Sequence, residues 1–145
     1  MDTNTEKLLV LVVEPGEEPY VKEIGAELED LQREVGGYIE AVSYYYDEPV
    51  AIICDETGKI RGKEPNRALR DKNGRVYDVV CGTFLVAGIG EEDFSSLDPR
   101  LIEKFTEHFR LSHRLPPEVL GFVDKLMEVA AAAEAEAANN EEVGV

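Results

Sequence analysis

An apolar run at residues 7–13 (KLLVLVV) limits the folds open to this chain more than any other segment. Its consecutive apolar side chains would cover both faces of a strand, so it predicts a central β-strand that is buried on both sides. Glu14-Pro15-Gly16 follows at once and predicts a turn, because proline and glycine favour turn conformations. The run is far shorter than the roughly 20 residues that a membrane-spanning helix needs.

A short strand at 20–24 and an amphipathic helix are expected next. Residues 24–35 carry apolar side chains at spacings of four, three and four, which predicts that Ile24, Leu28, Leu31 and Val35 share one face of a helix. Gly36-Gly37 then predicts a left-handed C-cap, because glycine adopts positive φ without steric cost.

The middle of the chain predicts strands separated by turns. Asp55-Glu56-Thr57-Gly58 predicts the loop of a hairpin that returns through Lys59 and Ile60. Residues 61–75 are expected to be irregular, since glycine, proline and Asn-Gly interrupt them. Strands are predicted at 38–45, 50–54, 76–80 and 83–89, with Gly82 as a bend between the last two.

Two helices are predicted in the last third of the chain. Asp98-Pro99 is typical of an N-cap followed by proline at the first helical position, with apolar residues at 101, 102, 105 and 109 facing the core. Pro116-Pro117 separates this helix from a second one. We therefore predict a single α+β domain at 7–115, a C-terminal helix at 116–138 and a disordered tail at 139–145. The domain is expected to hold a mixed or mainly antiparallel sheet covered by two to three helices.

Composition and motifs argue against several classes of protein. The chain has no nucleophile elbow and no phosphate loop, and Cys54 and Cys81 are expected to be reduced, buried and structural. The two histidines and two cysteines do not form a convincing zinc-binding pattern, so we expect no metal and no cofactor. Because the catalytic motifs are also missing, we expect no enzymatic activity. Without a recognisable signal peptide, the expected location is the cytoplasm.

Charge is distributed unevenly along the chain. The chain has 31 acidic and 15 basic residues and a formal net charge of −16, which disfavours direct binding to nucleic acids or anionic membranes. Residues 1–54 and 117–145 are strongly acidic, whereas residues 59–75 are basic and rich in turn-forming residues. Such a basic segment is either a local anion site or a solvated loop whose lysines balance neighbouring acids.

Three segments resemble one known family. They are LQREVGGYIEAV (31–42), VAIICDETGKIRGKEPNRAL (50–69) and VVCGTFLVAG (79–88). Over about residues 8–94 the chain resembles family 3846 of domains of unknown function. The resemblance implies a protein of a phage or mobile element of bacteria, with an accessory role toward the host, and it implies no particular activity.

The first of three functions that stay open is a small non-enzymatic binding module for an anionic molecule, such as a nucleotide. Arg67 would clamp the phosphate, Tyr38 would stack on the base, and Glu40 or Asn66 would orient a hydroxyl or base edge, with Thr83 completing the site. The alternative for Arg67 is an internal pair with Asp55 or Asp78. The aromatic run 44–46, expected on a strand, is either core packing or a stacking platform.

The second function is an acidic, nucleic-acid-mimicking inhibitor that binds a basic host protein. The third is a structural homo-oligomer in which the helix at 117–138 pairs with a second copy.

Overall fold

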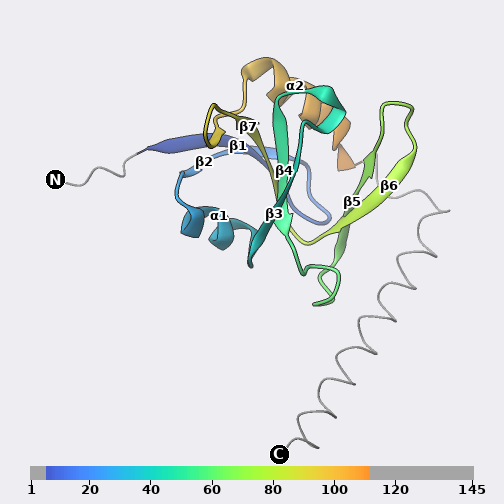
Figure 1. The fold of residues 1–145 in the computed structure, drawn as a ribbon. Coiled ribbons are helices and arrows are strands. Elements are labelled where there is room, and N and C mark those ends of the chain that lie inside the picture. The colour runs from blue at the N-terminus through green and yellow to red at the C-terminus, as the bar shows by residue number, and fades with distance from the viewer. Residues whose placement is uncertain (1–5, 112–145) are drawn as a thin grey trace, which may run out of the picture.

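A computed structural model describes residues 6–111 of the chain. Its main sheet has the strand order β2-β1-β7-β4-β3, with β8 paired to β7, and a separate two-stranded sheet joins β5 and β6 (Figure 1). All of these strand pairings are antiparallel. The elements are β1 (Lys7–Val13), β2 (Tyr20–Gly25), α1 (Leu28–Val35), β3 (Ile39–Ser43), the 3-10 turn η1 (Tyr45–Asp47), β4 (Val50–Asp55), β5 (Pro65–Arg70), β6 (Val76–Cys81), β7 (Phe84–Ile89), β8 (Phe94–Ser95) and α2 (Pro99–His108).

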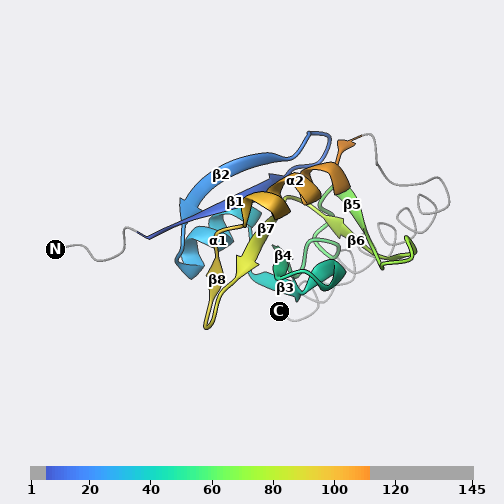
Figure 2. The same ribbon diagram turned by 90° about the horizontal axis from the view of Figure 1, so that it is seen from above.

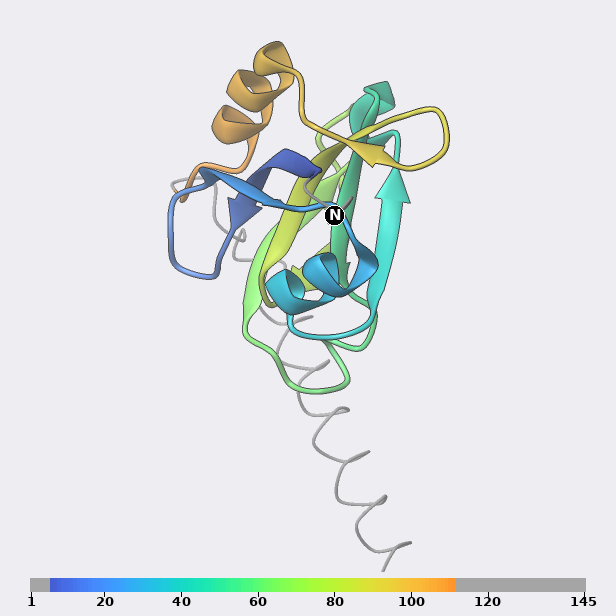
Figure 3. The same cartoon turned by 90° about the vertical axis from the view of Figure 1, so that its left-hand side faces the viewer.

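The three central strands β1, β7 and β4 are apolar on both faces and are buried on both faces. Helix α1 covers one face through Leu31 and Val35. The other face is covered by α2 and by the β5–β6 hairpin, whose apolar side chains share one cluster with β1, β4 and β7. Figures 2 and 3 show the two helices on different sides of the sheet. The strand predicted at 7–13 is therefore confirmed, and each of its two apolar faces packs in a hydrophobic cluster.

The helix ends follow the local chemistry that the sequence predicts. Gly36 ends α1 with φ of 79°, and its backbone N–H donates to the Gln32 carbonyl. Asp98 caps α2 by accepting a hydrogen bond from the Arg100 backbone N–H, and Pro99 occupies the first turn. Both features arise within a few residues, which is why the sequence alone is sufficient to predict them.

The α+β class is confirmed, and within residues 6–111 the sheet is accompanied by two α-helices. The predicted C-terminal helix at 116–138 and the tail at 139–145 lie outside the described residues. Among the described residues, no helix has the length and apolar character needed to cross a membrane.

Three local predictions are wrong. Lys59 and Ile60 lie in turns and form no return strand, because β4 is already paired on its two sides by β3 and β7. Residues 65–70, predicted to be irregular, form β5, since pairing with β6 and burial of Leu69 outweigh the turn-forming residues around them. Ile24 belongs to β2 rather than to the helix, and Leu28 is 53% exposed.

Candidate functional site

The residues predicted to form a site do not gather around one pocket. Tyr38 is 71% exposed, whereas Asn66 and Arg67 are buried at 5% and 1% exposure. Glu40 is exposed on β3, and Thr83 is half-buried between β6 and β7. Among the hydrogen bonds of the described residues, the one between two of these five side chains joins Asn66 and Arg67, which are adjacent on β5.

Arg67 is held by oxygen atoms of the protein itself. Its Nε donates to the Phe109 carbonyl at 2.9 Å, one terminal nitrogen donates to the Asn66 side-chain oxygen at 2.7 Å, and the other donates to the Glu17 carbonyl at 2.6 Å. The guanidinium thus joins the β1–β2 loop, β5 and the end of α2. The predicted alternative, a pair with Asp55 or Asp78, does not form, because those carboxylates bind other bases.

Asn66 has a matching internal role. Its side-chain nitrogen donates to the carbonyls of Val13 and Gly82, both at 2.9 Å. These bonds join the end of β1 to the bend between β6 and β7, while its side-chain oxygen accepts from Arg67. Asn66 therefore positions the arginine and satisfies two buried carbonyls, which orders this end of the sheet.

Glu40 lines a different, small pocket of about 50 Å³, together with both cysteines and Asp78. The Cys54 sulfur lies 3.8 Å from the Glu40 carboxylate, and burial raises the pKa of the Cys54 thiol to about 12. Both cysteines are buried and free, as predicted. A thiol with so high a pKa stays protonated at neutral pH and has little nucleophilic character.

A larger pocket of about 320 Å³ lies beside Arg67. We call it the arginine pocket. No carboxylate lines it in the part of the chain that the structure describes, although the protein is strongly acidic. Its lining residues are Tyr46, Arg67, Ala68, Arg70, His108 and Phe109.

Arg70 is the half-buried cation of this pocket. Its terminal nitrogen donates to the Gly74 carbonyl at 2.9 Å, within the turn between β5 and β6. The Arg70 backbone N–H donates to the Tyr45 hydroxyl at 2.9 Å, and that hydroxyl lies 2.8 Å from His108 Nε2. Tyr45 therefore connects η1, β5 and α2, and it fixes the elements that form the pocket wall.

A second pocket of about 240 Å³ adjoins the first and shares Tyr46 and Arg70 with it. We call it the tyrosine pocket, because Tyr44, Tyr45, Tyr46 and Tyr77 line it. The other lining residues are Val42, Ser43, Asp47, Asp71 and Lys72.

The aromatic run that forms part of this pocket is not on a strand, so that prediction is wrong. Tyr44, Tyr46 and Asp47 have φ of 58°, 56° and 54°, in the left-handed region. Such a conformation costs about 1–3 kcal/mol for a residue other than glycine, and it is concentrated at functional sites. Nothing in the sequence signals it, because asparagine or glycine would be the usual choice there.

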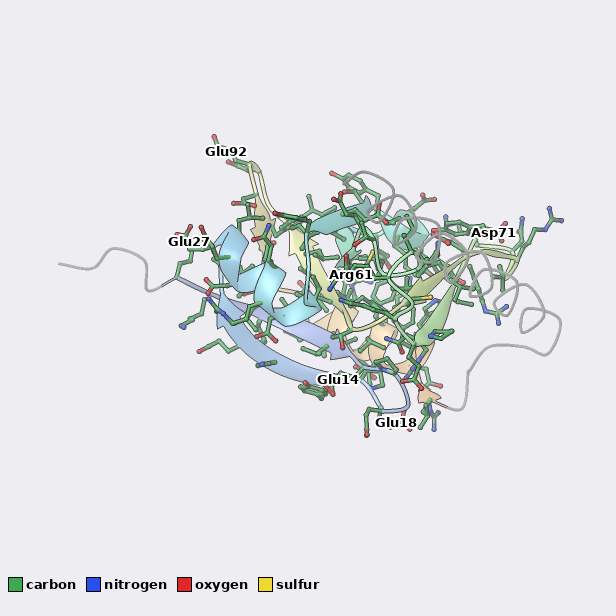
Figure 4. All side chains as sticks on the ribbon, turned by 90° about the horizontal axis from the view of Figure 1, so that it is seen from below. Glu14, Glu18, Glu27, Arg61, Asp71 and Glu92 are labelled. Atoms are coloured by element: carbon green, nitrogen blue, oxygen red, sulfur yellow. The ribbon has the colours of Figure 1, made fainter. Side chains whose placement is uncertain are left out.

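Most bases of the segment 59–75 are paired within the protein. Figure 4 shows the labelled acids Glu14, Glu18, Glu27 and Glu92 near the periphery, with Arg61 closer to the centre. The cations of Arg67 and Arg70 differ from the other paired bases, because their hydrogen bonds go to uncharged oxygens. The ion pairs in this segment are Lys59–Asp78, Arg61–Asp55, Lys63–Asp55 and Lys72–Asp47.

Arg67 is a site residue that the sequence suggested, whereas Tyr46, Arg70 and His108, which line the same pocket, were not predicted. Arg70 belongs to the basic segment, and this was the one available signal. His108 comes from α2, and only the fold brings it to β5.

A family model matches most of the chain. The model described as "Domain of unknown function (DUF3846)" matches residues 7–110, from the start of β1 to just beyond α2. No curated protein matches the chain. No solved structure matches it either. Because the family model covers well over half of the chain, the protein belongs to the DUF3846 family.

Proposed function

We propose that the protein is a non-enzymatic binding module that holds a small anion in the arginine pocket. The observation that carries this proposal is the lining of that pocket, in which the described residues include two arginines and a histidine and no carboxylate. The chain has 31 acidic residues, yet the lining of this pocket within residues 6–111 holds two arginines and no carboxylate, which favours an anionic ligand.

The charge of Arg67 supports the proposal because no carboxylate of residues 6–111 forms a hydrogen bond with it. Burial lowers the pKa of the Arg67 guanidinium from its ordinary value, and the nearby Glu18 carboxylate acts in the opposite direction. The Glu18 carboxylate itself accepts the Leu111 backbone N–H at 2.7 Å. Arginine remains protonated under all ordinary conditions, so Arg67 contributes a fixed positive charge in a region of low dielectric.

The two arginines then have different roles. Arg67 is bonded to three segments of the protein and contributes mainly its electrostatic field. Arg70 is less buried, and among the described residues its side chain donates to one carbonyl, that of Gly74. An incoming phosphate or carboxylate would replace the Gly74 carbonyl as the partner of Arg70, because a charged acceptor binds guanidinium more strongly than a neutral one.

The test is direct titration of the full chain with inorganic phosphate and pyrophosphate by isothermal titration calorimetry. We expect saturable binding that weakens as salt is added, and a loss of at least about tenfold in affinity for Arg70→Gln. Arg75→Gln is the matched control, because it removes the same charge from the same hairpin at an exposed residue that does not line the pocket. Absence of binding to either anion, or equal affinities for the two variants, would contradict the proposal.

A further inference from the structure

The arginine pocket and the tyrosine pocket are neighbours, because Tyr46 and Arg70 line both of them. Their volumes of about 320 and 240 Å³ together fall within the range of about 300–1,000 Å³ that is typical of small-molecule sites. Tyr46 on η1 and Arg70 at the end of β5 are therefore common to the two pockets. A ligand that extends from one pocket into the other would contact both residues.

The two pockets differ in chemistry. The tyrosine pocket contains the exposed rings of Tyr44 and Tyr77, at 58% and 54% exposure. It also contains the carboxylates of Asp47 and Asp71, and Asp47 forms an ion pair with Lys72 at 2.8 Å. The arginine pocket has the cations of Arg67 and Arg70, and none of its described lining residues is a carboxylate. This difference would orient a ligand with its anionic group toward the arginines and a neutral group toward the tyrosines.

We infer that the two pockets form one bipartite site for a nucleotide, with the phosphate against Arg70 and the base among Tyr44, Tyr46 and Tyr77. The inference rests on the proposed anion binding and adds the class of the ligand. Flat aromatic rings that remain exposed beside a cationic pocket are suited to a heterocycle linked to a phosphate, because every base has a face that stacks on tyrosine.

The left-handed backbone at Tyr44 and Tyr46 is a second, independent observation in favour of this site. On a regular strand, neighbouring side chains would point to opposite faces of the sheet. The turn instead places Tyr44, Tyr45 and Tyr46 around the same pocket, although they are consecutive in sequence. Tyr45 is buried and fixed by its bonds to Arg70 and His108, which leaves the other two rings to line the opening.

The experiment compares three kinds of ligand on the full chain by calorimetry: inorganic phosphate, ribose 5-phosphate and a series of nucleoside 5′-monophosphates. We expect at least one nucleotide to bind about tenfold more tightly than ribose 5-phosphate, since stacking of a single base strengthens binding by about five- to a hundredfold. The comparison isolates the base, because ribose 5-phosphate retains the sugar and the phosphate.

Two variants remove rings from the tyrosine pocket without disturbing the core. Tyr77→Leu removes an exposed ring from β6. Tyr44→Asn removes a ring and introduces a residue type that tolerates the positive φ at this position. Each should reduce nucleotide affinity toward that of ribose 5-phosphate and leave phosphate affinity unchanged. Tyr38→Leu is the control, since Tyr38 is 71% exposed and lines neither pocket.

The outcomes separate this inference from the proposed function. If phosphate binds and no nucleotide binds more tightly than ribose 5-phosphate, the bipartite site is wrong and the anion site stands. If a nucleotide binds tightly but neither Tyr77→Leu nor Tyr44→Asn weakens it, the base lies elsewhere and the inference is again wrong. If none of the ligands binds, both proposals fail.

Discussion

At the scale of single residues, Arg67 sets the energetics of the site. It is the largest fully buried side chain of the described residues, and burying a guanidinium without partners would cost several kcal/mol. Oxygen atoms from Glu17, Asn66 and Phe109 replace the water that it loses. Arg67, which the sequence suggests as a ligand-binding residue, therefore links three segments of the protein to one another.

The first prediction concerns the stability of the Arg67→Met variant. We expect the free energy of unfolding to fall by about 3 kcal/mol or more, because three oxygen acceptors lose their charged donor inside the protein. Urea denaturation followed by circular dichroism measures this loss. Arg67→Lys retains the charge but not the planar guanidinium group, so its free energy of unfolding should lie between those of the parent protein and Arg67→Met. A variant as stable as the parent would show that these bonds contribute nothing.

At the scale of elements, the turn after β4 stabilises the short helix α1. Lys63 Nζ donates to the Val35 and Gly36 carbonyls at 2.9 and 3.1 Å, at the helix end where carbonyls have no partner within the helix. Asp55 holds Lys63 and Arg61 in place at 2.6 and 3.1 Å. Helix α1 has only eight residues, so these contacts provide order that its own length cannot.

Close packing beside Asp55 strengthens this connection. A Cβ atom at Gly37 would lie 2.6 Å from the Asp55 carboxylate oxygen, which only glycine avoids. Burial by itself would raise the pKa of Asp55, but hydrogen bonds from Lys63 and Thr57 and the charge of Lys63 hold the pKa below its ordinary value of 3.8. The ionised form of Asp55 therefore stabilises the fold above the ordinary pKa, and this contribution disappears as pH falls below it.

The second prediction is that Asp55→Asn lowers the free energy of unfolding by about 1.5–3 kcal/mol at pH 7, since charged hydrogen bonds are lost. The amide protons of α1 should also exchange faster, because the bases that cap the helix lose their anchor. Hydrogen exchange and urea denaturation measure the two effects. The difference in stability from the parent protein should shrink below pH 3.8, and a difference that persists at lower pH would contradict the role of the charge.

At the scale of the whole molecule, long-range ion pairs connect α2 to the sheet. Glu48, in the connection from η1 to β4, binds Arg100 at 3.2 Å and Lys104 at 2.6 Å, both on α2. Hydrogen bonds from Arg100 and Lys104 lower the pKa of Glu48 from 4.5 to about 2. Since the folded protein lowers this pKa, the stabilisation is complete above about pH 4.5 and is lost as pH falls toward about 2.

The third prediction concerns the stability of the Glu48→Gln variant above and below the pH range from about 4.5 to about 2. Glu48→Gln should be less stable than the parent protein between pH 5 and 7, and the difference should vanish near pH 2. Thermal unfolding of both proteins at each pH gives the difference in their stability. The general effect of the net charge of −16 acts on both proteins and cancels in this difference. Glu103→Gln is the control, because it removes an exposed acid from α2 that forms no ion pair within the described residues. A difference that does not change with pH would contradict the ionic role of Glu48.

The sequence by itself determined the features that depend on neighbouring residues. The apolar strands at 7–13 and 50–54, the Gly36 cap and the Asp98-Pro99 helix start all follow from local patterns, and the structure has them at those places. The class of the fold followed from the same patterns, since alternating strands and helices restrict the ways in which apolar faces can be buried.

Only the tertiary structure decided where the candidate site lies. Tyr46, Arg70 and His108 come from three elements far apart in sequence, and their meeting depends on how α2 and the β5–β6 hairpin pack on one face of the sheet. Tertiary packing also placed three consecutive tyrosines around one pocket in a conformation that local preferences disfavour. The sequence indicates which residues carry charge and aromatic surface, whereas long-range packing determines which of them share a pocket.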